Sequence, residues 1–267
     1  MRRQGSGFRV QGSEKKIKVY SKMGMLFVFF CLWSVSAETD IDLNRIFYKA
    51  NELYASGEYT QAIEEYKRIL EEGHESGSLY YNLGNSYFKA GYLGEAILYY
   101  ERARRLMPRD GDLLSNYSHA SSLVKGNIYE PRERWFLRFI YKVFEEFTIN
   151  EITILLSVIY LLITAALLAA ALFNIRRQAV IAVSILAVVA VIGLLELSKD
   201  MDRLGKEAVM IPESAEAKFE PFERATTHFT LYEGMKVRMI QKKDGWRKIE
   251  RPDGKVGWVE GASLEII

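Results

Sequence analysis

Two long apolar segments, residues 152–173 and 179–197, are separated by only five residues, Asn174 to Gln178. Each segment is close to the roughly 20 residues that a helix needs to cross the apolar interior of a bilayer. A five-residue gap is too short to hold a domain, so the segments are expected to form an antiparallel transmembrane hairpin within residues 151–198. The regions before and after the hairpin then lie on the same side of the membrane.

The turn of this hairpin contains Arg176 and Arg177. Cytoplasmic loops of membrane proteins carry an excess of Lys and Arg, which places the turn in the cytoplasm. Both soluble regions are therefore expected to face the periplasm, at a bacterial inner membrane. Neither span has an ionisable side chain before Glu196, which argues against a transport path or a proton relay.

Residues 1–37 have the pattern of a secretory signal peptide. A basic region up to Lys22 precedes an apolar stretch, residues 23–35. This segment ends in a small-residue cleavage pattern at Ala37. An uncleaved anchor is the alternative, although the apolar stretch is short for a span. Cleavage would remove Cys31, the one cysteine of the chain, so the exported part is expected to fold without disulfides.

The charge balance gives no sign of nucleic-acid binding. The chain has a formal net charge of +2, and seven basic residues against one acid in residues 1–37 leave about −4 for the remainder. No basic stripe remains outside the signal peptide and the membrane flanks.

The region before the hairpin contains two copies of a 34-residue pattern, residues 43–76 and 77–110. The matching positions are Gly57, Ala62 and Tyr66 in the first copy and Gly91, Ala96 and Tyr100 in the second. Small residues let two antiparallel helices approach, tyrosines fill the gap, and the glycine permits the turn. The pattern resembles the tetratricopeptide repeat. This resemblance implies an all-α solenoid in residues 38–126 that closes with a capping helix, residues 111–125.

The first copy departs from the repeat pattern, with Ile46 at the usual Trp position, Lys49 where Leu is expected, and His74 in place of the closing Pro. Two repeats and a cap are also fewer than the roughly three repeats that such arrays normally need. Either the cap supplies the missing surface, or the array docks onto a partner or a second copy.

The first helix of each tetratricopeptide repeat lines a concave face. Six side chains are predicted there as a partner-binding surface: Phe47, Asn51, Tyr54, Tyr81, Asn85 and Phe88. Amides can satisfy the backbone of an extended peptide while aromatic rings cover its side chains. The alternative is that asparagine is simply common at this repeat position and that the aromatics belong partly to the core. Lysines that clamp a terminal carboxylate in some relatives are absent, so a carboxylate clamp is not expected.

Residues 127–150 are predicted to form an amphipathic juxtamembrane connector. Aromatic and aliphatic residues recur at helical spacing from Trp135 to Phe147, and charged residues such as Arg138 and Glu146 occupy the other face. An interfacial helix on the outer leaflet is the simplest interpretation. A partner-binding helix is the alternative.

Residues 205–267 predict a small all-β domain, because short alternating runs are broken by turn signals at residues 243–245 and 252–254. The order of the pieces resembles a bacterial Src-homology-3 domain, and relatives bind peptides or cell-wall material through an aromatic groove. The candidate ligand surface is Tyr232, Trp246 and Trp258, although both tryptophans can equally be core and rim packing. Gly261 stands where the groove proline is expected, so recognition of PxxP ligands is not predicted.

The sequence offers no catalytic or metal-binding constellation. The three histidines, His74, His119 and His228, lie in unrelated segments without metal-ligand spacing. No phosphate-binding glycine loop and no serine elbow is present. We therefore predict neither an enzyme nor a cofactor.

The combination of signal peptide, short repeat array, aromatic juxtamembrane helix, membrane hairpin and terminal Src-homology-3 barrel resembles the BatE proteins of bacterial aerotolerance operons. The resemblance implies partners that carry von Willebrand factor A domains, together with a MoxR-type ATPase, and it implies no mechanism. The main prediction is a non-enzymatic scaffold that binds protein partners at the inner membrane. Binding of peptidoglycan or sensing of envelope stress through the barrel is the alternative, and transient binding of exported clients is a third.

Overall fold

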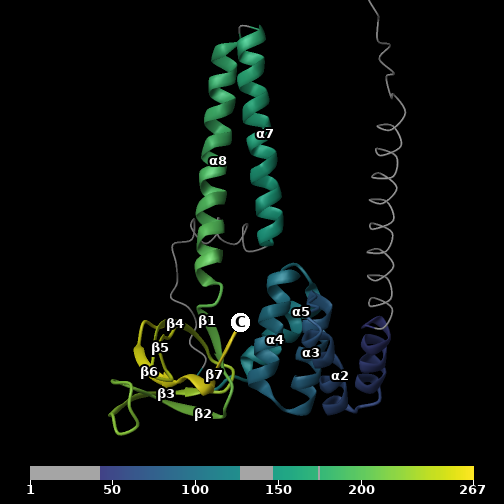
Figure 1. The fold of residues 1–267 in the computed structure, drawn as a ribbon, viewed down its shortest axis with the longest axis vertical. Helices are drawn as coiled ribbons and strands as arrows, with labels where there is room; N and C mark the ends of the chain where they lie inside the picture. Colours follow the sequence, from purple (N-terminus) through teal and green to yellow (C-terminus); the bar gives the residue numbers. More distant parts are fainter. Residues whose placement is uncertain (1–42, 127–146, 174) are drawn as a thin grey trace, which may run out of the picture.

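A helical array, a helical hairpin and a β-sheet follow one another along the chain (Figure 1). The computed structural model describes residues 43–126, 147–173 and 175–267. The predicted signal peptide and residues 127–146 of the predicted connector lie outside the described residues. Within the described part, the predicted fold class is confirmed: a tetratricopeptide-like helical region, two apolar helices, and an antiparallel sheet that fits a Src-homology-3 domain.

The array consists of antiparallel helices joined by short turns. Residues 43–55 are helical, and the following helices are α2 (Tyr59–Glu71), α3 (Gly77–Ala90), α4 (Leu93–Leu106) and α5 (Gly111–Ser122). Ser76 and Asp110 cap α3 and α5, since their side chains accept hydrogen bonds from the backbone N–H groups of Leu79 and Leu113. These caps fix where the helices of the second repeat and the closing helix begin.

Close packing of α3 on α4 depends on a missing side chain. A Cβ atom at Gly84 would lie 2.7 Å from the Tyr100 ring, which is well inside van der Waals contact. Tyr87 and Tyr99 fill the neighbouring space and stack in parallel, with ring centroids 5.3 Å apart. Gly91 ends α3 in the left-handed conformation, at φ 90°, which a residue with a side chain rarely adopts. The repeat pattern is thus explained by helix-to-helix contact.

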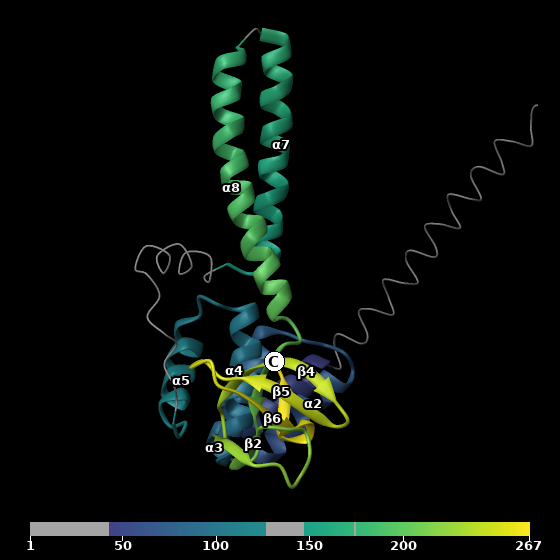
Figure 2. The same cartoon turned by 90° about the vertical axis from the view of Figure 1, so that its left-hand side faces the viewer.

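The hairpin is formed by α7 (Ile149–Phe173) and α8 (Arg176–Arg203). Both helices are long and apolar enough to cross a membrane, judged by length and composition. They pack along each other, and Gly193 lies against Leu156. Figure 2 shows the hairpin projecting from one end of the array and the sheet. α8 continues beyond residue 197, so its last turns are polar and reach the sheet.

The C-terminal region is a seven-stranded antiparallel sheet with the order β3-β2-β6-β5-β4-β1-β7. Its strands are β1 (Glu207–Met210), β2 (Ser214–Lys218), β3 (Thr227–Tyr232), β4 (Lys236–Lys243), β5 (Trp246–Glu250), β6 (Val256–Glu260) and β7 (Leu264–Ile266). A tight turn joins β4 to β5, where Asp244 and Gly245 both have positive φ. Val209, Leu231, Ile249 and Val259 are fully buried and form the interior of the sheet.

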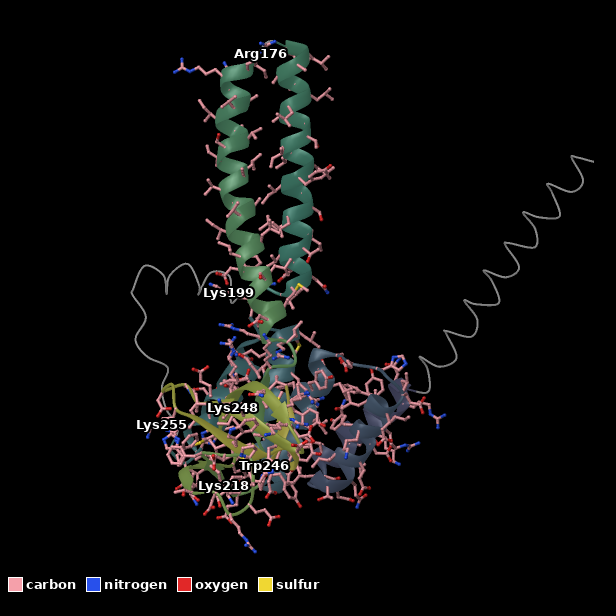
Figure 3. All side chains as sticks on the ribbon, turned by 60° about the vertical axis from the view of Figure 1, so that its left-hand side comes forward. Arg176, Lys199, Lys218, Trp246, Lys248 and Lys255 are labelled. Carbon is pink, nitrogen blue, oxygen red and sulfur yellow. The ribbon has the colours of Figure 1, made fainter. Side chains whose placement is uncertain are left out.

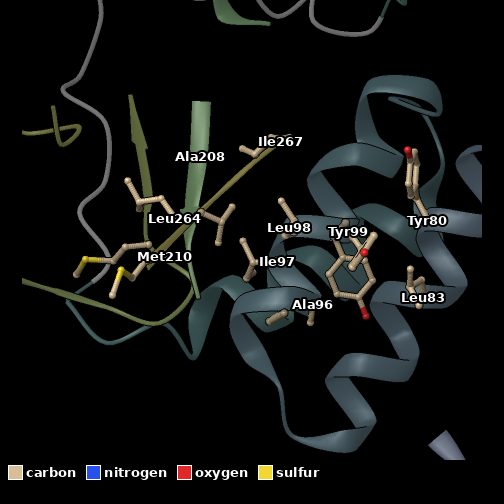
Figure 4. Close-up of a cluster of buried hydrophobic side chains, with 14 of the residues drawn as sticks. Tyr80, Leu83, Ala96, Ile97, Leu98, Tyr99, Ala208, Met210, Leu264 and Ile267 are labelled. Carbon is tan, nitrogen blue, oxygen red and sulfur yellow. The ribbon is translucent and has the colours of Figure 1, made fainter. Parts of the chain in front are cut away.

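The array and the sheet share one hydrophobic core. Ile97 and Leu98 of α4 are buried facing β1 and β7, where Ala208, Met210 and Leu264 are also buried (Figure 4). The sequence did not predict this contact. The C-terminal domain of the same chain, in addition to the capping helix, supplies the surface that a two-repeat array lacks.

Candidate functional site

The six predicted concave-face residues lie on two helices, residues 43–55 and α3, and all six are partly buried. The four aromatic residues among them pack against the core of the array: Phe47, Tyr54, Tyr81 and Phe88. Each therefore has one side in the core and part of its surface open to solvent.

Asn51 joins the first repeat to the second. Its amide oxygen accepts hydrogen bonds from the hydroxyl of Tyr66 on α2, at 2.6 Å, and from the Nδ2 of Asn82 on α3, at 3.0 Å. Burial raises the pKa of Tyr66 to about 12, so its hydroxyl remains protonated and donates.

Asn85 repeats this arrangement one repeat further along. Its amide oxygen accepts from the Tyr100 hydroxyl at 2.7 Å and from the Nδ2 of Asn116 at 2.9 Å. Asn116, on α5, also donates to the Tyr81 hydroxyl at 3.0 Å. Sequence reasoning missed Asn82 and Asn116, although they are 34 residues apart like the other matched positions.

The two asparagine pairs thus form a ladder that connects consecutive helices of the concave face. Within the described part of the chain, the amide nitrogens of Asn51 and Asn85 donate no hydrogen bond, whereas each amide oxygen accepts two. An amide held through its oxygen can present its N–H donors to a bound backbone carbonyl at little further loss of conformational freedom. The hydrogen bonds support a structural role of these residues and leave a binding role available.

The barrel presents a second surface that combines tryptophan and lysine. Lys248 on β5 and Lys218 on β2 both pair with Trp258 on β6, and the Lys248 Nζ lies 5.8 Å from the Trp258 ring centroid. The Lys218 Nζ lies 5.8 Å from the ring centroid of Trp246. Lys218, Trp246 and Lys248 are labelled in Figure 3. Both distances are within the range of a cation–π contact. Trp258 is only 8% exposed, so Trp246 and the lysines form the accessible part.

Tyr232 lies away from this surface. It pairs with Ser214, four residues along β2 from Lys218, which corresponds to about 13 Å of strand. Its ring faces Gly126 at the end of the array. The structure brings the two predicted tryptophans together and does not bring Tyr232 to them.

A buried carboxylate lies between the array and the barrel. Glu101 of α4 is 2% exposed, and it is bonded by Lys236 of β4 at 2.9 Å, by Arg104 at 3.0 Å and by the Tyr117 hydroxyl. Burial alone would raise the pKa of Glu101, but the charges of Lys236 and Arg104 and the hydrogen bond from Tyr117 hold it well below its usual range. Burial and the Glu101 charge raise the pKa of Tyr117 to about 12.

Further polar contacts fix the same interface. Arg102 and Arg105 donate to the main-chain oxygens of Ile266 and Ile267, each at 2.6 Å. The interface pair of Glu101 had one signal in the sequence: Glu101 is four residues after Ile97, so the two side chains lie on the same face of the helix. A buried charge needs to be paired, and here Lys236 supplies a partner from outside α4.

The base of the hairpin contacts both the array and the barrel. Arg109, in the turn between α4 and α5, pairs with Glu151 of α7 at 2.5 Å and lies 5.6 Å from the Phe147 ring. Asp202 of α8 pairs with Arg238 of β4 at 2.9 Å. Exposed ion pairs such as these contribute little stability, but they show which surfaces are in contact.

The comparisons with known proteins identify both soluble parts. Residues 77–110 match the model "Tetratricopeptide repeat", and residues 50–91 match "TPR repeat". Residues 220–265 match "Bacterial SH3 domain", where SH3 stands for Src-homology 3. The chain contains tetratricopeptide repeats and a C-terminal bacterial Src-homology-3 domain. A comparison with curated proteins gives no match, so the resemblance to BatE proteins stays a prediction.

Both kinds of module are typical of non-enzymatic interaction proteins. Tetratricopeptide repeats indicate protein–protein contact, and a bacterial Src-homology-3 domain indicates cell-wall binding. Among the described residues, no group of three or more His, Cys, Asp or Glu side chains could hold a metal ion.

Proposed function

We propose that this protein is a non-enzymatic, membrane-anchored scaffold that binds protein partners through the concave face of its repeat array. The observation that carries this proposal is the asparagine ladder flanked by partly exposed aromatic rings. It offers fixed N–H donors and apolar surface side by side, which are the two features that recognition of an extended peptide requires.

The anchor in this proposal is the α7–α8 hairpin, inserted in a bacterial inner membrane with both soluble parts in the periplasm. Arg176 lies at the tip of the hairpin, far from the array and the barrel (Figure 3). A cytoplasmic tip with Arg176 and Arg177 accords with the usual bias of basic residues. The resemblance to BatE proteins supports partners with von Willebrand factor A domains, within a Bat membrane complex.

Site-specific photocrosslinking in cells tests the concave face. A photoreactive phenylalanine analogue at Phe88, or at Phe47, keeps an aromatic ring in place and is expected to give discrete adducts. The same analogue at Lys67, which is exposed on α2, is the control and is expected to give none. Equal adducts from Phe88 and Lys67 would contradict binding at the concave face.

Cell-wall binding by the barrel is the second candidate, supported by the Trp246 surface with its two lysines. Because the barrel shares its core with α4, the suitable test uses the full chain in detergent, sedimented with purified sacculi. Trp246→Ala is expected to reduce co-sedimentation severalfold, and Lys242→Ala, on the exposed end of β4, serves as control. Unchanged co-sedimentation of Trp246→Ala would exclude this surface.

A further inference from the structure

A tyrosine lies in the middle of the hairpin and faces outward. Tyr160 is next to Leu161, the central residue of α7, and it is 67% exposed. The hairpin projects away from the array and the barrel, so among the described elements only α8 packs along the middle of α7 (Figure 2). Within the described part of the chain, the Tyr160 hydroxyl makes no hydrogen bond.

This position is unfavourable for a hydroxyl that faces lipid. Tyrosine in membrane proteins is enriched at the membrane–water interfaces, where its hydroxyl reaches polar groups. The hydrocarbon core is about 30 Å thick, so the headgroups lie about 15 Å from the middle of a span, beyond the reach of a tyrosine side chain. A hydroxyl without a hydrogen-bond partner in hydrocarbon is costly. Tyr160 therefore needs an acceptor that the described part of its own chain does not supply.

Tyr160 belongs to a row of hydroxyl side chains along α7. All members of this hydroxyl row are exposed: Thr153, Ser157, Tyr160 and Thr164. Their spacing of four, three and four residues keeps them on one face of the helix. The same spacing marks the seam along which two helices pack at a small crossing angle, both in coiled coils and in most membrane bundles.

The hydroxyl row does not point toward α8. The α8 side of α7 is marked by Leu156, which would lie 3.1 Å from a Cβ atom at Gly193, and by Ile159, which is 4% exposed. Ser157 and Tyr160 each come one residue later. At 3.6 residues per turn, they are turned about 100° around the helix axis from the α8 side. The hydroxyl row is therefore a second packing face, which α8 leaves free.

The hydroxyl row contains both kinds of hydrogen-bonding group. The hydroxyls of Ser157 and Thr164 donate to the backbone oxygens of Thr153 and Leu161, at 2.9 and 2.8 Å. Their oxygens keep lone pairs that can accept a further bond, whereas Tyr160, between them, keeps a free donor. A face with a free donor flanked by two acceptors is complementary to a copy of itself.

We propose that the hydroxyl row packs against the hydroxyl row of a second copy of this chain, in a two-fold symmetric dimer within the membrane. The inference rests on the proposed membrane anchoring, because the Tyr160 hydroxyl requires a partner only in hydrocarbon. Both copies have the same orientation, so each Tyr160 faces acceptors about 4.5 Å and 6 Å along the axis of the opposite helix. The two-fold axis makes both hydrogen bonds at once. Serine and threonine at the seam let the helices approach closely.

Energy transfer between labelled copies of the full chain in lipid vesicles measures the dimer. Cys31→Ser together with Lys242→Cys, on the exposed end of β4, provides one site for a donor or an acceptor dye. Dilution with lipid then gives the dissociation constant. Tyr160→Phe removes the hydroxyl and keeps the ring. The matched control is Ser184→Ala, which removes an exposed hydroxyl from α8.

The natural chain is expected to show energy transfer that falls as lipid is added. Tyr160→Phe should raise the dissociation constant about threefold to thirtyfold, the range expected from hydrogen bonds between membrane helices. Ser184→Ala should leave it unchanged. An unchanged dissociation constant in Tyr160→Phe, or an equal increase in both variants, would overturn the proposal.

Photocrosslinking identifies what covers the hydroxyl row in cells. Two forms of the full chain with different tags are expressed together, with a photoreactive phenylalanine analogue at Tyr160. An adduct that carries both tags is expected. The same analogue at Leu162, which is 50% exposed and turned nearly to the opposite side of α7, should give none. An adduct of Tyr160 with a different membrane protein alone would assign the face to that protein and overturn the dimer.

Extraction of the membranes at alkaline pH separates the two possible failures. Release of the chain by this treatment would overturn the membrane anchoring, and the dimer with it. Retention of the chain, without energy transfer and without adducts that carry both tags, would overturn the dimer alone.

Discussion

The substitution Lys236→Met tests whether the buried carboxylate couples the array to the barrel. It removes the ion pair that joins Glu101 to the barrel and keeps an unbranched apolar side chain that is one atom shorter. A hydrogen bond to a charged group contributes about 1.5–3 kcal/mol. Lys236 is 30% exposed, so solvent screening reduces this value, and Arg104 and Tyr117 remain bonded to the carboxylate. We expect a loss of about 1–2 kcal/mol in the free energy of unfolding.

Removal of the carboxylate itself should have a larger effect. Glu101→Ala leaves the ammonium of Lys236 and the hydroxyl of Tyr117 without their buried partner. Loss of one member of a buried ion pair typically destabilises by about 3–5 kcal/mol. Comparison of the free energies of unfolding of Lys236→Met and Glu101→Ala therefore separates the contribution of the Lys236–Glu101 pair from that of the whole network.

The assay is urea unfolding of the full chain in detergent, followed by two probes. Far-ultraviolet circular dichroism at the helix minimum reports the array together with the hairpin, and tryptophan fluorescence includes Trp246 and Trp258 of the barrel. In the natural chain the array and barrel transitions should coincide, because the two parts share one core. In Lys236→Met they should shift together to lower urea, and Lys242→Met should leave them in place. Unchanged midpoints in Lys236→Met would refute the coupling.

Three further predictions follow from the same structure. Because folding lowers the pKa of Glu101, its contribution to the free energy of unfolding is complete above the ordinary glutamate pKa of about 4.5 and is lost as the pH falls below it. Glu101→Gln should therefore make the unfolding temperature less dependent on pH between about pH 3 and 6. Gly94→Ala places a Cβ 2.9 Å from the Met210 carbonyl oxygen and should destabilise the interface by about 1–3 kcal/mol in urea unfolding, whereas Gly111→Ala, with open space around it, should not. Asn85→Ala leaves the buried Tyr100 hydroxyl without its acceptor and should lower the free energy of unfolding by about 1–3 kcal/mol; an unchanged midpoint would show that the ladder is not structural.

Local periodicity was enough to predict the helices of the array, the two apolar helices and strands β1, β4, β5 and β6. Gly84 and Tyr100 belong to a pattern whose spacing is set by contact between neighbouring helices, so a single sequence reveals it. Strand β2 was not predicted. Its sequence, Ser-Ala-Glu-Ala-Lys, contains no β-branched or aromatic residue and forms a strand because β3 and β6 pair with it.

Local residue periodicity could not predict contacts between segments that are distant in the sequence. Arg105 meets Ile267 across 162 residues, and nothing in the spacing of either segment specifies that meeting. The candidate sites likewise include residues that local repetition predicts and groupings that depend on long-range pairing. Asn51 and Asn85 were found because they repeat, and the grouping of Trp246 with Trp258 to the exclusion of Tyr232 depends on strand register, which the sequence leaves open.

Only three residues separate the end of α8 at Arg203 from the start of β1 at Glu207. This link is itself held, since the Met239 backbone N–H donates to the Lys206 carbonyl oxygen at 2.6 Å and Lys206 pairs with Asp202. These contacts restrict the orientation of α8 relative to the sheet. If α8 spans the bilayer as proposed, a tilt imposed by a thinner or thicker bilayer would also move the barrel and, through the shared core, change the direction in which the concave face of the array points.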